Sequence, residues 1–125
     1  MIKQSKYDGV FVALRNILQK HSNRLSVTAD SPGYYCLSVD FSAKLGKGFP
    51  VAWVNIGKAY VSYHLMPVYM FPKLLDGLSK ELRARMQGKS CFNFKVVNES
   101  LFKELEQATT RGLKMSKDAG YASGK

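Results

Sequence analysis

The fold is decided by residues 60–69, Tyr-Val-Ser-Tyr-His-Leu-Met-Pro-Val-Tyr, and by residues 86–94, Met-Gln-Gly-Lys-Ser-Cys-Phe-Asn-Phe. The first stretch alternates polar and apolar side chains up to Pro67, which predicts a strand that ends there. The second stretch predicts the end of a helix, a Gly-Lys turn and another strand. The segment between them has helical spacing and a basic side, so a helical connection should join the two strands.

Earlier segments extend this sheet. Residues 25–29, 34–41, 51–56 and 58–65 alternate in the way of strands, and short turn sequences separate them. Short connections between neighbouring strands predict a largely antiparallel sheet. One face of it should carry the apolar side chains of Tyr35, Leu37, Val39, Phe41, Val54, Val61, Tyr63, Phe92 and Phe94.

Helices are predicted at both ends of the chain and before the last strand. Residues 6–20 have one apolar stripe, and a second striped helix begins after Asn98, which is placed to cap it. Gly112 is expected to end that helix, so residues 1–112 form a single domain and residues 113–125 a flexible basic tail. Ser79 is placed to cap the short middle helix.

The predicted order is therefore α-β-β-β-β-α-β-α, an α+β domain. Each terminal helix has a single apolar stripe, so we expect both to cover the same face of the sheet.

The hairpin between residues 51–56 and 58–65 decides what the other face carries. A two-residue turn at Ile56-Gly57 or at Gly57-Lys58 pairs different residues across the hairpin. In both registers Val54 lies on the helix-covered face and Trp53 on the other face. Only a loop with an odd number of residues would change this, because the side-chain period of a strand is two.

The face without helices is predicted to be aromatic. Clustered aromatic side chains on such a face indicate a binding site or a subunit interface. The alternative is that residues 66–78 fold over this face and make a second small core. The residues that we expect to bind a ligand there are Trp53, Tyr60, Ser62, His64, Cys91 and Asn93, with Tyr34, Cys36 and Asp40 on the same face.

The residue types on this face are used in several kinds of chemistry. His, Cys and Asp side chains are common metal ligands, but nothing in the spacing of His64, Cys91, Cys36 and Asp40 brings them together, so no metal ligand and no cofactor is predicted. Cys91 and His64 would form a nucleophilic pair only in hydrogen-bond contact. Residues 88–90, Gly-Lys-Ser, lack the rest of a P-loop. They leave one prediction: an anion site made by Lys89 with Arg83 or Arg85.

The overall composition favours anionic partners. The chain has 19 Lys and Arg against nine Asp and Glu, a net charge of +10. This charge is spread along the chain, so nucleic-acid binding is an alternative and not the main expectation. Two cysteines in no metal spacing fit a reducing compartment. The N-terminus has no signal-peptide pattern and no apolar run reaches the roughly 20 residues of a membrane span, so we expect a cytoplasmic protein without a membrane partner.

Residues 60–69, 77–82 and 86–94 together resemble the YdhG-like family of small bacterial domains of unknown function, over about residues 7–112. The Gly-Lys turn before an aromatic strand and a final helix is the most specific part. The resemblance implies a compact α+β domain without an established enzymatic activity. One branch of the family is described as a frataxin-like iron chaperone. Iron handling of that type relies on acidic surface residues, and this chain has nine acids in all, so no ligand is carried over.

The sequence therefore predicts a non-enzymatic domain that binds a small anionic or aromatic ligand, or a protein partner, on its aromatic sheet face. Three alternatives stay open: a homodimeric assembly domain, an iron-handling protein, and a nucleic-acid-binding protein.

Overall fold

The computed structural model describes residues 6–121. The elements in chain order are α1 (Asp8–Gln19), β1 (Ser26–Ser31), β2 (Tyr34–Ser42), β3 (Lys47–Ile56), β4 (Val61–Leu65), α2 (Met66–Met70), the 3-10 helix η1 (Pro72–Gly77), α3 (Lys80–Arg83), β5 (Met86–Gln87), β6 (Cys91–Phe94) and α4 (Glu99–Asp118). The predicted α+β class and the order of the main elements are confirmed. None of the helices in this part of the chain has both the length and the apolar character to cross a bilayer.

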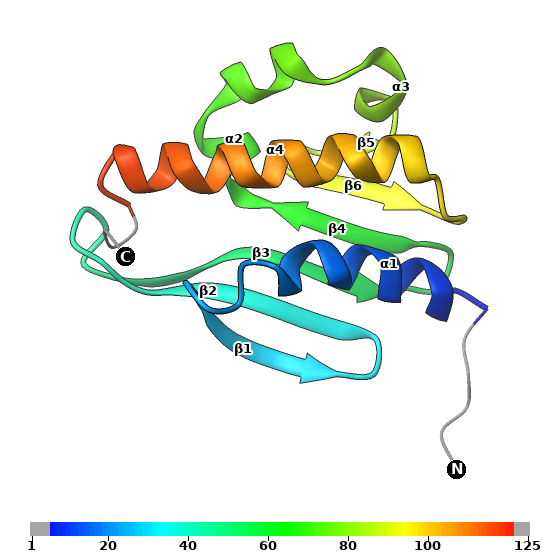
Figure 1. Ribbon diagram of the computed structural model, residues 1–125, viewed down its shortest axis with the longest axis horizontal. Helices are drawn as coiled ribbons and strands as arrows, with labels where there is room; N and C mark the ends of the chain where they lie inside the picture. Colours follow the sequence, from blue (N-terminus) through cyan, green and yellow to red (C-terminus); the bar gives the residue numbers. More distant parts are fainter. Residues whose placement is uncertain (1–5, 122–125) are drawn as a thin grey trace.

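The strands form one six-stranded antiparallel sheet in the order β1-β2-β3-β4-β6-β5 (Figure 1). The strand β5, at the edge of the sheet, was not predicted. The sequence pattern extends the middle helix to Met86, but α3 ends at Arg83, and Met86 instead pairs with Phe92. Ser79 does cap α3, since its Oγ accepts from the Leu82 amide at 3.1 Å.

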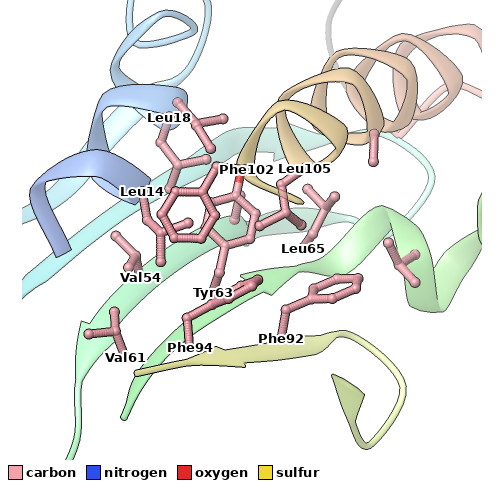
Figure 2. Packing of buried hydrophobic residues seen from close by; sticks show 14 of the residues in the cluster. Leu14, Leu18, Val54, Val61, Tyr63, Leu65, Phe92, Phe94, Phe102 and Leu105 are labelled. Carbon is pink, nitrogen blue, oxygen red and sulfur yellow. The ribbon is translucent and has the colours of Figure 1, made fainter. Parts of the chain in front are cut away.

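Both terminal helices cover one face of the sheet, as predicted (Figure 1). Figure 2 shows their apolar side chains, among them Leu14 and Leu105, pointing at those of the strands. Burial of this apolar surface is the main force that holds the two layers together. Eight of the nine side chains predicted for this face are buried: Tyr35, Leu37, Val39, Val54, Val61, Tyr63, Phe92 and Phe94.

The ninth, Phe41, is an error of the prediction. Its side chain is 59% exposed. The pairing of β2 with β3 is irregular between Val39 and Ser42, and a bulge of this kind interrupts the alternation of side chains between the two faces. The sequence alternates without a break at this point, so the pattern alone did not indicate the bulge.

The middle segment lies on the helix-covered side of the sheet. Val68, Leu74 and Leu78 are buried in the same core as the terminal helices, and α2, η1 and α3 all contact α4. The carboxylate of Glu104 in α4 also accepts from the Ser79 amide at 2.9 Å. The alternative in which residues 66–78 cover the opposite face is therefore wrong.

The last helix is longer than predicted. Gly112 lies inside α4, which continues to Asp118, and Gly112 itself is buried against Pro67 at the start of α2. Glycine serves here for close approach of two elements and not as a helix end. The predicted tail consequently begins within a helix, while residues 122–125 of that prediction lie outside the described residues.

The hairpin between β3 and β4 keeps the predicted facing but not the predicted turn. Ile56 pairs with Val61, and Trp53 pairs with His64. Residues 57–60 form the connection, so neither of the two proposed turns is correct. The loop still has an even number of residues, and Trp53 consequently faces away from Val54 and the core.

Candidate functional site

We call the side of the sheet opposite α1 and α4 the open face, and we define it by two rows of side chains that run across the strands. In the first row Cys36 pairs with Trp53, Trp53 with His64, and His64 with Cys91. Gln87 completes the row opposite Cys91. The register therefore brings three predicted site residues next to one another.

The second row lies two residues away along each strand. Tyr34 pairs with Asn55, Asn55 with Ser62, and Ser62 with Asn93. Tyr60 reaches the same surface from the loop before β4, because its hydroxyl donates to Gln87 Oε1 at 3.2 Å. The residues predicted for the open face therefore share one surface: Trp53, Tyr60, Ser62, His64, Cys91 and Asn93.

Trp53 and His64 form an aromatic stack at the centre of the open face. Their ring centroids are 4.6 Å apart and their planes differ by 12°. Both side chains are only partly buried. Stacked aromatic neighbours on adjacent strands stabilise each other by about 0.5–1.5 kcal/mol, so each ring restricts the rotation of the other.

Asn93 organises the polar part of the open face. Its Oδ1 accepts from Ser62 Oγ at 2.8 Å and from Cys91 Sγ at 3.2 Å, and its Nδ2 donates to Gln87 Oε1 at 2.8 Å. These bonds join β4, β6 and β5 and set the orientation of both amides. Gln87 Oε1 accepts from Tyr60 and Asn93, which leaves the Gln87 amide nitrogen as a donor without a partner in residues 6–121.

Two ring nitrogens of the stack, Trp53 Nε1 and His64 Nδ1, are accessible to solvent. Within the described chain, Arg15 Nε is the one buried side-chain nitrogen or oxygen without a hydrogen-bond partner. Trp53 Nε1 and His64 Nδ1 have no protein partner in that range either, so neither atom is buried. The open face therefore presents an indole donor, an imidazole nitrogen and the Gln87 amide around a rigid aromatic centre.

Cys91 and His64 do come into contact, but not as an activated pair. The distance from Cys91 Sγ to His64 Nε2 is 3.7 Å. Burial raises the pKa of the Cys91 thiol, although a hydrogen bond with Ser62 partly offsets this increase. Burial lowers the pKa of His64. A nucleophilic pair needs a thiolate and therefore a lowered cysteine pKa. At neutral pH both groups are uncharged, which does not favour covalent catalysis.

The side chains considered for a metal site do not come together. Cys36 lies in β2 and Cys91 in β6, so β3 and β4 separate the two cysteines in the sheet. Among residues 6–121, no three His, Cys, Asp or Glu side chains lie close enough together to hold a metal ion. Asp40 instead accepts a hydrogen bond from Ser26 at the edge of the sheet.

The three residues of the predicted anion site, Lys89, Arg83 and Arg85, lie in different local surroundings. The ammonium of Lys89 lies 5.8 Å from the centroid of the Tyr69 ring, and Arg83 is the last residue of α3. The Arg85 carbonyl accepts from the Asn93 amide at 2.9 Å. Arg85 itself lies in the turn before β5, since its amide donates to the Leu82 carbonyl at 2.9 Å, and this backbone bond brings it next to Asn93 at the end of the second row.

Sequence reasoning missed Gln87 and Asn55 as members of the open face. The sequence pattern puts Gln87 at the end of the middle helix, although the Gly88-Lys89 turn before an alternating strand is equally typical of a hairpin. Gly88 has φ of 80°, the left-handed conformation that such turns need. Asn55 lies on the same face as Trp53 by alternation, two residues further along β3.

Acidification should quench the fluorescence of Trp53, the chain's single tryptophan, because a protonated imidazole then stacks on the indole. Burial lowers the pKa of His64 from its ordinary 6.5, so we expect the midpoint below 6.5. Emission measured between about pH 8 and about pH 5 checks this. His64→Gln should remove the transition, and a transition of equal size in that variant would contradict the stack.

The same shift makes the fold less stable in acid. Between the lowered folded pKa of His64 and its unfolded value of 6.5, the unfolded chain binds more protons. Stability therefore falls as the pH drops through this window and levels off below the folded pKa. His21 adds to the effect in the same direction, because burial and the nearby Arg24 lower its pKa.

The sequence matches no family model, no curated protein and no solved structure. The fold and the open face define the class of protein: an α+β domain with a one-sided antiparallel sheet and an uncovered aromatic-polar surface. The resemblance to the YdhG-like family stays a prediction.

Proposed function

We propose that this protein is a non-enzymatic binding domain whose open face takes a small anionic ligand with a planar aromatic ring. The observation that carries the proposal is the Trp53–His64 stack, held on the sheet at 4.6 Å between ring centroids and left uncovered by every helix of residues 6–121. An ordered indole gives no advantage to a face that only contacts water, but on a face that binds an aromatic ring it provides a stacking surface.

Stacking supplies the first part of the recognition. An aromatic side chain that stacks on a heteroaromatic ring contributes about 1–3 kcal/mol per ring. The Trp53 side chain is already held in place by its neighbour, so less conformational freedom is lost when a ligand binds.

Polar groups around the stack supply orientation. The unpartnered donors at Trp53 Nε1 and the Gln87 amide fit ring nitrogens and carbonyl oxygens of a heteroaromatic ligand. Arg85, whose carbonyl is bonded to the Asn93 amide, would supply a positive charge for the anionic group, and the net charge of +10 favours the approach of anions in general.

The neutral states of Cys91 and His64 support binding over catalysis. Neither group has the pKa shift that a nucleophile or an ion pair requires, and Cys91 Sγ is within 3.2 Å of Asn93 Oδ1, to which it donates. A non-enzymatic role also agrees with the YdhG-like resemblance.

Adenosine 5′-monophosphate is a suitable probe, because it combines a planar ring with an anion. We expect saturable binding by calorimetry, weaker binding of adenosine, which lacks the anion, and weakest binding of ribose 5-phosphate, which lacks the ring. Trp53→Ala should reduce the affinity by roughly tenfold or more, since it removes the stacking term.

Tyr69→Ala is the matched control, because Tyr69 is a 55% exposed aromatic of α2, a helix that packs on η1 and α4. Its affinity should equal that of the wild type. Equal affinities of Trp53→Ala and Tyr69→Ala, or a failure of all three compounds to bind, would refute the proposal. If sedimentation shows instead a dimer that Trp53→Ala dissociates, the open face is a subunit interface.

A further inference from the structure

A cleft on the other side of the sheet is not part of the open face. It has a volume of about 800 Å³ and lies where the segment after α1, the second half of β2 and the C-terminal half of α4 meet. Small-molecule sites typically occupy about 300–1,000 Å³, so the cleft is large enough for a ligand of modest size.

The cleft has an apolar floor. Val39 and Val51 belong to the buried core and line the cleft, together with the partly buried Leu25 and Leu113. Phe41 lies at its edge with 59% of its surface exposed. The irregular pairing between Val39 and Ser42 is what turns Phe41 out of the core, and bulges often redirect a side chain beside a functional site.

The charges around the cleft are unevenly paired. Lys114 forms an ion pair with Asp118 at 2.8 Å, and Asp40 accepts a hydrogen bond from Ser26. Arg24 and Lys117 also line the cleft, and neither has a carboxylate partner in residues 6–121. The lining therefore carries an excess of one positive charge next to its apolar floor, three cations (Arg24, Lys114 and Lys117) against two carboxylates (Asp40 and Asp118).

We propose that this cleft binds an amphipathic anion, with an apolar chain or ring on the Val39–Val51 floor and an anionic head group on Arg24 and Lys117. The apolar part would cover Phe41, whose exposure in the free protein is otherwise unfavourable. Charge-assisted hydrogen bonds to the guanidinium and ammonium would fix the head group. The site is independent of the proposed function, because Trp53 and His64 lie on the opposite face.

Octanoate is the probe for this cleft. Calorimetry should show saturable binding of octanoate, weaker binding of the shorter butanoate, and none of octylammonium, which has the wrong charge. Lys117→Glu and Arg24→Glu should each weaken octanoate binding by roughly tenfold or more, since each removes a hydrogen bond to a charged group. Phe41→Ser should weaken octanoate more than butanoate.

Lys103→Glu is the control, because Lys103 is an exposed cation of the same helix that does not line the cleft. It makes the same charge change and should bind octanoate like the wild type. Melting temperatures confirm that each variant is folded. The fluorescence of Trp53 should stay constant during the titration.

Absence of saturable octanoate binding to the folded wild type would overturn the proposal. An equal loss of affinity in Lys103→Glu and Lys117→Glu would also overturn it, because the effect would then come from net charge. A change of Trp53 emission that follows octanoate binding would place the ligand on the open face instead.

Discussion

Phe92→Ala should lower the free energy of unfolding by about 3–5 kcal/mol, the usual loss for a large aromatic removed from a core. The Phe92 side chain is fully buried, with 0% of its surface exposed, on the helix-covered face of β6. Figure 2 shows it among the side chains that lie under α4. Urea denaturation of the wild type and the variant measures the difference.

Trp53→Ala is the matched comparison, since it removes a larger aromatic from the other face of the same sheet. We expect it to cost no more than about 1–2 kcal/mol, mainly the stacking with His64. The smaller loss for the larger side chain follows only if the sheet is covered on one side. Equal losses, or a greater loss for Trp53→Ala, would put the indole in the core.

Gly112→Val should destabilise the protein by about 2–3 kcal/mol through overpacking. A Cβ atom at position 112 would lie 2.7 Å from Pro67 Cβ and 3.3 Å from Leu74 Cδ1. Pro67 is rigid and lies in the first turn of α2, so it cannot move aside as the end of a flexible side chain can. The whole middle segment would have to shift away from α4. Thermal and urea denaturation both measure this loss.

Gly9→Ala is the control for this substitution. Gly9 lies near the start of α1, and a Cβ built there meets nothing within 4 Å. Replacing a helical glycine without a clash stabilises by about 0.5–1 kcal/mol. Opposite signs at positions 9 and 112 are therefore expected. A Gly112→Val variant as stable as the wild type would contradict the close packing of α4 on α2.

Local patterns were sufficient for the layers of this fold. The alternation in residues 58–65 and 90–95 fixed which side chains enter the core, and the caps at Ser79 and Asn98 are used as expected, with Asn98 Oδ1 accepting from the Leu101 amide at 3.0 Å. The face on which a side chain lies depends only on whether the hairpin loop has an even or odd number of residues. The face of Trp53 was therefore predicted correctly although the turn was not.

The errors arise where tertiary packing overrides the local signal. Gly112 has the sequence context of a helix end, but its contact with Pro67, which is distant in the chain, requires a glycine within the helix. Phe41 follows the strand alternation, and a bulge that no residue type indicates reverses it. The contact of Cys91 with His64 and the cleft beside Val51 depend on strand order and helix placement, which alternation does not contain.

The most direct test of a ligand-binding open face is the indole proton–nitrogen resonance of Trp53, because the chain has a single tryptophan. Spectra recorded during the adenosine 5′-monophosphate titration follow that one signal. We predict that it shifts progressively and saturates at the dissociation constant found by calorimetry. An indole signal that stays in place while the nucleotide binds would contradict the account, because the ligand would then bind elsewhere.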